Sequence, residues 1–120
     1  MLQRSDRLRS SRDIMHVYRQ GRFGAAGSLQ VKTLHRPERP TVATVVISKK
    51  VAKKAVDRNA ARRRLFALLQ RHWETLRPGC AIVVTVRSEV ASLSPVELEK
   101  QLLSALDRSS AVRPMNRKET

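Results

Sequence analysis

The feature that most constrains the fold is residues 48–70, SKKVAKKAVDRNAARRRLFALLQ, where a cluster of positive charge opens a helix that is otherwise patterned for burial. From Val56 onward the apolar residues recur at helical spacing, so one side of this helix is expected to pack on a core. Asp57 is the only acid in the stretch. The cations are Lys49, Lys50, Lys53, Lys54, Arg58, Arg62, Arg63 and Arg64.

This cationic surface could be a solvated helix face, a localisation signal or a binding surface. On a solvated face, cations are usually paired with acids three or four residues away, and Arg62, Arg63 and Arg64 have none at those distances. Localisation signals usually lie in exposed tails, whereas this cluster belongs to a core helix. Arg58 and Asn59 stand at the helix start, where backbone N–H groups and the helix dipole favour anions. The pattern therefore favours a surface that binds closely spaced phosphates.

The charge of the whole chain also favours a polyanionic partner. With 25 Lys and Arg against 10 Asp and Glu, the formal charge is +15 and the isoelectric point is near 11.6. Nucleic acid is the commonest partner of so basic a domain. Binding to a membrane surface would require a free amphipathic helix, and none is visible in the sequence. No apolar run approaches the roughly 18 residues that span a bilayer. We expect a cytoplasmic protein that binds nucleic acid and no membrane.

The apolar periodicity predicts helices at residues 10–20, from 56 and from 95, and strands at 29–34, 41–48 and 80–88. Residues 21–28 are expected to be a glycine-rich connection. The first two strands are expected to form a hairpin, with the second, almost entirely apolar, in the centre of the sheet. Ser94, Pro95 and Glu97 predict a capping box at the last helix. The order α-β-β-α-β-α predicts a two-layer α/β (α+β) sandwich, with a single domain at 1–108 and a basic, disordered tail at 109–120.

The sequence offers little for a nuclease that works without a partner. Its acids are scattered, and a structural or surface role is favoured for His16, His35 and His72. No glycine-rich phosphate loop is present. Cys80, the single cysteine, is expected to act as a small buried hydrophobe. We therefore expect no catalytic residue on this chain and assign no metal ligand to it.

The segment VVISKKVAKKAVDRNAARRRL resembles part of the protein component of bacterial ribonuclease P. In this pattern a buried strand ends in Ser-Lys-Lys, a short turn follows, and Ala-Val-x-Arg-Asn opens an arginine-rich helix. RLRSSRDIMHVYRQGRF is similar to the N-terminal helix of the family, and RPGCAIVVTVRSEVASLSPVELEKQLLSAL is similar to its last strand and helix. The resemblance covers about residues 6–106.

The resemblance implies an accessory subunit of an endonuclease whose catalyst is RNA. Such a protein would bind the ribonuclease P RNA and precursor tRNA, and would assist the magnesium-dependent removal of the 5′ leader. The Mg²⁺ would be held mainly by the RNA subunit and the substrate. The resemblance also implies a left-handed β-α-β crossover around the arginine helix, although most such connections are right-handed. Dimerisation of the holoenzyme stays open, and the alternative function is a ribosomal or ribosome-assembly protein.

Two sets of contact residues follow from the resemblance. The docking set, for the catalytic RNA, consists of the eight cations of residues 48–70 together with Asn59. The cleft set, for the leader, lies between the first helix and the sheet and consists of Ile14, Tyr18, Gln30, Lys32 and Ser48.

The docking set departs from the family pattern at two positions. Ala60 stands where the family has the second arginine of Arg-Asn-Arg, and Phe66 replaces a later arginine of the same helix. Whether neighbouring cations compensate for these changes is left open by the sequence.

The aromatic residues have two interpretations. In the first helix Ile14 and Tyr18 occupy the two positions that carry aromatic residues in the family, so stacking of bases is expected to be weaker here. Helical periodicity by itself favours core packing for both, and favours it more strongly for Phe23, Phe66 and Trp73.

Overall fold

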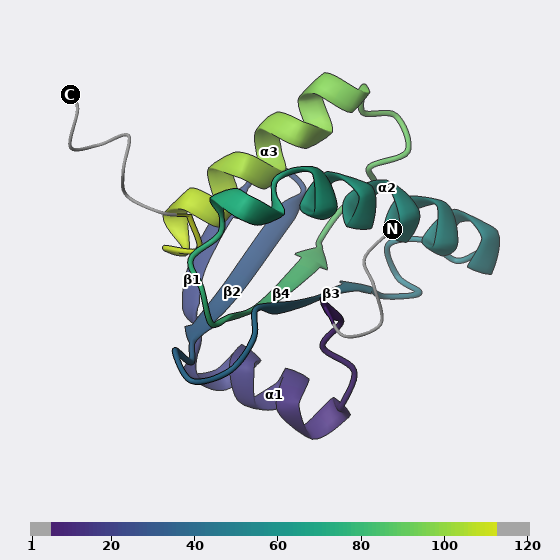
Figure 1. Cartoon of the computed structure of the whole chain (residues 1–120). Helices are drawn as coiled ribbons and strands as arrows, with labels where there is room; N and C mark the ends of the chain where they lie inside the picture. The colour runs from purple at the N-terminus through teal and green to yellow at the C-terminus, as the bar shows by residue number, and fades with distance from the viewer. Residues whose placement is uncertain (1–5, 113–120) are drawn as a thin grey trace.

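The computed structural model describes residues 6–112, which form one mixed sheet with helices on both faces (Figure 1). Helix α1 covers one face, and helices α2 and α3 cover the other. The helices are α1 (Ser11–Gln20), α2 (Ala55–Arg71), the short 3-10 helix η2 (Trp73–Thr75) and α3 (Pro95–Arg108). The strands are β1 (Arg22–Ala26), β2 (Leu29–His35), β3 (Val42–Ile47) and β4 (Cys80–Val86). The predicted α+β class and the three predicted helices are confirmed, but helices on both faces of the sheet make three layers where two were predicted.

The order of the strands differs from the prediction. In the described residues the sheet runs β1-β2-β4-β3, and β4 lies between β2 and β3. The predicted hairpin of residues 29–34 with residues 41–48, now β2 and β3, is therefore wrong, because β2 pairs antiparallel with β4 while β3 pairs parallel with it. The expected central position of residues 41–48 is also wrong, since β3 stands at the edge of this sheet. The most continuously buried strand is β4, which pairs on both sides.

Strand β1 lies in the segment that was expected to be a connection. It forms an antiparallel hairpin with β2, in which Phe23 is opposite Lys32 and Ala25 is opposite Gln30. Gly27 and Ser28 make the two-residue turn, and Gly27 has a φ of 56°, which glycine adopts without strain. A Gly-Ser pair between two strands is a known signal for such a hairpin.

Strands β3 and β4 are parallel neighbours joined through α2, so the chain contains the predicted β-α-β crossover. A parallel pair needs such a connection because the chain must return to the end where the first strand began. The left hand of this crossover stays a prediction from the family resemblance.

The buried side chains form two clusters, one on each face of the sheet. The larger cluster joins α2 and α3 to the sheet and includes Phe66 and, at its margin, Trp73, as predicted. Cys80 is buried in it, and burial raises the pKa of its thiol, so the side chain is a neutral hydrophobe. The smaller cluster lies under α1 and comprises Leu8, Val17, Val42, Ala81 and Val83, with Ile14 and Leu34 packed against it. Phe23 is in neither cluster and is 51% exposed, so its predicted core position is wrong.

After α3 ends, the next residues still pack on the rest of the domain, so the domain extends past the predicted boundary at residue 108. Ser109 and Ala111 are buried, and the Thr33 and Ser109 hydroxyls are 2.8 Å apart. The Arg77 amide donates to the carbonyl of Ala111 at 2.8 Å. A tail that begins at residue 109 is therefore wrong for residues 109–112, and the rest of the predicted tail lies outside the described residues.

A substitution at Gly24 tests how closely α3 packs on β1. A Cβ atom at this position would lie 2.5 Å from the Ala105 carbonyl oxygen and 2.5 Å from the Ser109 nitrogen, both of them backbone atoms. We expect Gly24→Ala to lower the free energy of unfolding by at least about 1–3 kcal/mol, because backbone cannot move aside as a side chain can. Urea unfolding measures this. Ala25→Ser, on the opposite face of the same strand, should change stability by less than about 0.5 kcal/mol. Equal stability of Gly24→Ala and wild type would contradict the close packing.

Candidate nucleic-acid interface

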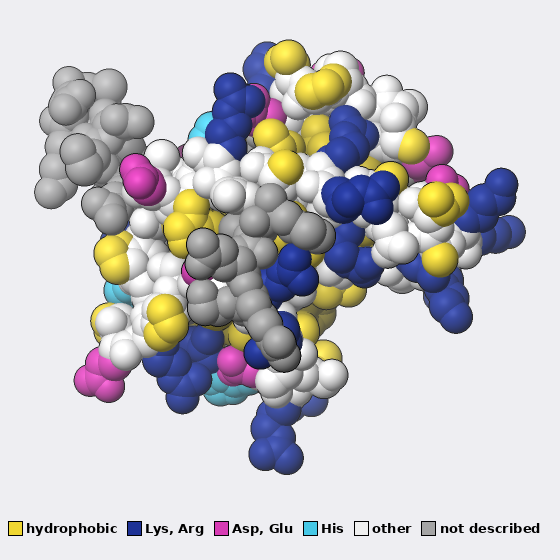
Figure 2. Space-filling view, turned by 45° about the vertical axis from the view of Figure 1, so that its right-hand side comes forward, with side chains coloured by type: hydrophobic (Ala, Val, Ile, Leu, Met, Phe, Trp, Pro, Cys, Tyr) yellow, Lys and Arg dark blue, Asp and Glu magenta, His cyan; other side chains and the backbone are white. Residues whose placement is uncertain are grey.

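The start of α2 carries the first part of the docking set. Lys49, Lys50, Lys53 and Lys54 are all exposed in the turn between β3 and α2. Lys54 is the N-cap and no side chain caps the helix, so N–H groups of the first turn have no capping acceptor. Figure 2 shows Lys and Arg side chains gathered on the side of the molecule where α2 lies. The structure therefore brings the four lysines to the positive end of the helix dipole.

Two arginines of the docking set are held by backbone carbonyls. Arg58 Nη1 donates to the carbonyls of Ala52 at 2.9 Å and Lys53 at 3.0 Å, which ties the lysine turn to α2. Arg64 Nη1 donates to Val90 at 3.1 Å, and its Nη2 donates to Leu93 at 2.9 Å. Both side chains are half-buried. An arginine has five N–H donors, so these bonds orient the guanidinium groups and leave other donors for a ligand.

The remaining members of the docking set lie on the open side of α2. Arg62 Nη1 donates to Asn59 Oδ1 at 3.2 Å. Asn59 and Arg63 are exposed, and none of these three residues has an ion pair with an acid in the described part of the chain. Ala60 lines a neighbouring pocket of about 500 Å³ between the lysine turn and the loop after β4. These three side chains therefore form a polar and cationic surface without an ion-paired acid in the described residues.

Three members of the cleft set meet on the opposite face of the sheet, beside α1. Gln30 Nε2 donates to the Tyr18 hydroxyl at 3.4 Å, and Lys32 Nζ lies 5.9 Å from the centroid of the Tyr18 ring. Tyr18 is 39% exposed, so packing in the core, which periodicity favoured, is not its position. Together these side chains present a polar, cationic and aromatic surface to the solvent.

Phe23 completes this surface and was missed by the sequence analysis. Lys32 Nζ lies 5.5 Å from the centroid of the Phe23 ring, so the ammonium group stands near two aromatic rings. Strand pairing places Phe23 directly opposite Lys32 and on the same face. A hairpin with its turn at Gly27 and Ser28 pairs Phe23 with Lys32, so recognising this turn in the sequence would have placed Phe23 on the face of Lys32. We call Tyr18, Phe23, Gln30 and Lys32 the aromatic patch.

Two members of the cleft set stand apart from the aromatic patch. Ile14 is half-buried and packs against the smaller core cluster, so the core interpretation applies to it. Ser48 is exposed just after β3, which is separated from β2 by β4. The structure thus brings together Tyr18, Gln30 and Lys32 of the predicted five, and not Ile14 or Ser48.

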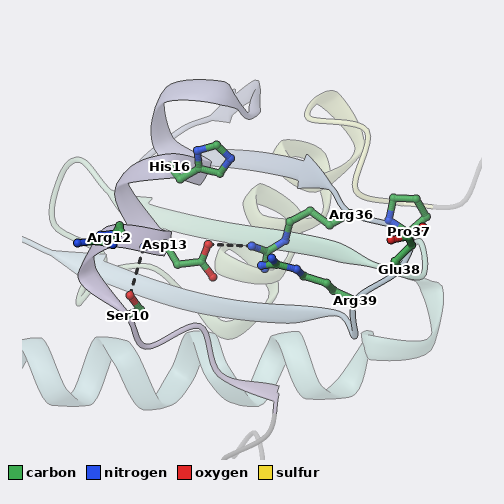
Figure 3. A pocket seen from close by; sticks show the side chains of 8 residues that line it. All are labelled: Ser10, Arg12, Asp13, His16, Arg36, Pro37, Glu38 and Arg39. Carbon is green, nitrogen blue, oxygen red and sulfur yellow. Dashed lines mark hydrogen bonds and ion pairs between the residues drawn. The ribbon is translucent and has the colours of Figure 1, made fainter.

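A charged pocket of about 670 Å³ opens between the start of α1 and the loop after β2, as Figure 3 shows. Arg36 Nη1 donates to Asp13 Oδ1 at 2.8 Å across it. His16 and Arg39 also line the pocket. Because Asp13 already neutralises Arg36, the main effect of this contact is to fix α1 against the sheet and so to set the position of Tyr18. The pattern of the sequence gave no signal for this pair.

No group of three His, Cys, Asp or Glu side chains gathers within residues 6–112 in a way that could hold a metal ion.

His72 and Glu99 form a contact between two helices, with Nε2 and Oε2 2.6 Å apart, and Arg71 lies 3.8 Å from the same carboxylate. This contact joins the end of α2 to α3 and lies far along the helix from its cationic start. The hydrogen bond from His72, with the nearby charge of Arg71, lowers the pKa of Glu99.

The Glu99 contact predicts a pH dependence of stability. A carboxyl group whose pKa is lowered by folding stabilises the protein above its unfolded pKa, and this contribution is lost as the pH falls through the folded pKa. Glu99→Gln should therefore lower the free energy of unfolding at pH 7, and its difference from wild type should shrink as the pH falls below about 4. Urea unfolding between pH 7 and 3 measures this. Glu74→Gln is the control, because Glu74 is exposed and has no ion pair within the described residues. A difference that does not depend on pH would contradict the expectation.

No helix in residues 6–112 is long and apolar enough to cross a membrane.

The fold and the site define a small α+β domain with a cationic helix on one face of its sheet and an aromatic patch on the other. The sequence profile of the family described as Ribonuclease P matches residues 2–110. The chain belongs to the family of ribonuclease P protein components, the protein part of a bacterial tRNA-processing enzyme.

Curated relatives agree with this assignment, and solved structures share the fold. The ribonuclease P protein component of Clavibacter michiganensis subsp. michiganensis is 34% identical over 91% of this chain and 96% of that protein. The protein component of Synechococcus elongatus is 41% identical over 72% of this chain and 74% of that protein. The RNase P protein of Staphylococcus aureus has a similar fold, with a TM-score of 0.80 at 20% identity, over 92% of this chain and all of that one. That of Thermotoga maritima gives 0.76 at 23% identity, over 85% of this chain and 96% of that one.

Proposed function

We propose that this chain binds the catalytic RNA of ribonuclease P and the 5′ leader of precursor tRNA, and that it assists the cleavage that removes the leader. The hydrolysis is carried out by the RNA subunit with bound Mg²⁺. No cluster of metal ligands in residues 6–112 supports a magnesium site on the protein itself. The protein contributes binding and orientation of the two RNA molecules.

The observation that carries the proposal is the separation of two different surfaces by one sheet. The docking set lies on α2 and the turn before it, whereas the aromatic patch lies on the face that α1 covers. The protein can therefore contact the catalytic RNA with one face and the substrate with the other. A protein that binds a single RNA has no need of the second surface, so the arrangement favours this function over a ribosomal one.

The chemistry of each surface suits a different form of RNA. Guanidinium and ammonium groups without paired acids suit the phosphates of a folded RNA. Aromatic rings suit the bases of a single strand, because every base has a face on which to stack. In the aromatic patch, Lys32 adds a charge for the phosphate next to bases that stack on Tyr18 and Phe23.

Reconstitution tests the proposed division of labour. The purified protein alone should not cleave precursor tRNA, because it supplies binding and no catalytic group. With its cognate catalytic RNA, it should allow processing at a magnesium concentration where that RNA alone is slow. Gel analysis of 5′-labelled precursor tRNA, with each component omitted in turn, measures both results. Cleavage by the protein without RNA would contradict the proposal.

The two surfaces should respond differently to mutation. Tyr18→Ala and Phe23→Ala should each weaken binding of precursor tRNA that bears a leader by about 5- to 150-fold, because one stacked base contributes roughly 1–3 kcal/mol. Neither should change the binding of tRNA without a leader. Arg63→Ala should weaken binding to the catalytic RNA whether or not a leader is present.

Val96→Ala is the matched control, because Val96 is an exposed apolar side chain at the start of α3, on the other face from the patch. Affinities of the reconstituted enzyme for substrates with and without a leader, measured by filter binding, separate the two effects. An equal loss for both substrates in Tyr18→Ala would contradict a role in leader binding. A loss that parallels a fall in melting temperature would indicate a structural role instead.

A further inference from the structure

Arg7 comes from the segment before α1, yet its side chain lies against α2. The Leu8 amide donates to the carbonyl of Ala43 at 2.9 Å, and Arg7 forms a short parallel bridge with the same residue. The side chain of Leu8 is buried in the smaller core cluster. The segment therefore runs beside β3, the edge strand, and is fixed there by a backbone bond and a buried anchor.

The guanidinium group of Arg7 lies over an aromatic ring of α2. Its Cζ atom lies 5.3 Å from the centroid of Phe66, within the range of a cation–π contact. Phe66 is 4% exposed, whereas Arg7 is half-buried, so the arginine covers the ring and keeps part of its own surface in the solvent. The Nε atom of Arg7 is buried and has no hydrogen-bond partner among the described residues. The ring thus holds in place a guanidinium group whose Nε has no hydrogen-bond partner within residues 6–112.

The charge of Arg7 adds to that of the docking set. Arg62 and Arg63 precede Phe66 by four and three residues, and residues at these spacings share one side of a helix. No ion pair within residues 6–112 joins Arg7 to an acid. Guanidinium groups gathered in this way repel one another, and a polyanion bound across them relieves the repulsion.

We propose that Arg7 binds a phosphate of the catalytic RNA, so that the docking surface extends from α2 onto the segment before α1. This inference rests on the proposed function and adds a contact to it. The contact with Phe66 holds the guanidinium group in place before the RNA arrives, so little side-chain freedom is lost on binding. The planar fork of an arginine matches two oxygens of one phosphate.

The test is the salt dependence of binding between the full-length protein and its cognate catalytic RNA. Arg7→Gln removes the charge and retains most of the stem that covers Phe66. We expect about 3- to 10-fold weaker binding at low salt, and a slope of log K against log salt that is shallower by roughly 0.7–0.9, the value for one lost phosphate contact. The ratio of affinities for precursor tRNA with and without a leader should not change. Lys100→Ala, which removes a charge from the exposed side of α3, should leave the slope as in wild type.

Phe66→Leu removes the ring and leaves the charge of Arg7 in place. It keeps an apolar side chain in the core, so the domain should still fold. In that background Arg7→Gln should have a smaller effect than in wild type, since the ring no longer orients the arginine. An unchanged slope in Arg7→Gln, with a shallower one in Arg63→Ala, would overturn this inference alone and leave Arg7 as a cover for Phe66. Binding of wild type that does not depend on salt would overturn the proposed function as well.

Discussion

The structure depends on how α2 attaches to the sheet. Ala61, Leu65 and Leu69 are buried against the core, while Asn59 and Arg63 are exposed on another side of the same helix. Burial of the two leucine side chains stabilises the domain by roughly 1.5–3 kcal/mol each, which offsets the repulsion among the cations that the helix holds together. The helix is therefore both a core element and a rigid support for positive charge. Arg58 and Arg64 extend this rigidity to the flanking loops, because their guanidinium groups bind loop carbonyls.

The sheet gives the two surfaces their fixed relation. Along β2, Leu29 and Val31 face the larger core cluster, while Gln30 and Lys32 face the side of α1. Because side chains alternate across a strand, one strand supports both faces and a shift by one residue would exchange them. The ion pair of Asp13 with Arg36 fixes α1 on its own face. Docking on the catalytic RNA through α2 would thus orient the aromatic patch at the same time.

Local patterns in the sequence were sufficient to predict the helices. The Ser10 and Ser94 caps, helical spacing and the buried stripe of α2 all depend on residues within a few positions of one another. The order of the strands depends on contacts between distant residues, and an apolar strand such as β3 does not reveal whether its edge is covered. Here the segment at Arg7 and Leu8 lies along part of that edge, which explains how so apolar a strand can stand there. Phe23 was misplaced for a similar reason, since its face follows from its pairing with Lys32 and not from helical spacing.

The two departures from the family pattern have different structural consequences. At Ala60 a short side chain lines a pocket, and Arg64, one turn further, is held in the loop after β4. At Phe66 an aromatic ring occupies a position where the resemblance leads us to expect arginine. A ring cannot bind a phosphate, but its face attracts a guanidinium group, and Arg7 occupies that face. A positive charge is therefore present at this point of α2 although the helix itself does not carry it. The surface can keep its charge while its residues change, because an RNA phosphate responds to the position of a guanidinium group and not to the segment that supplies it.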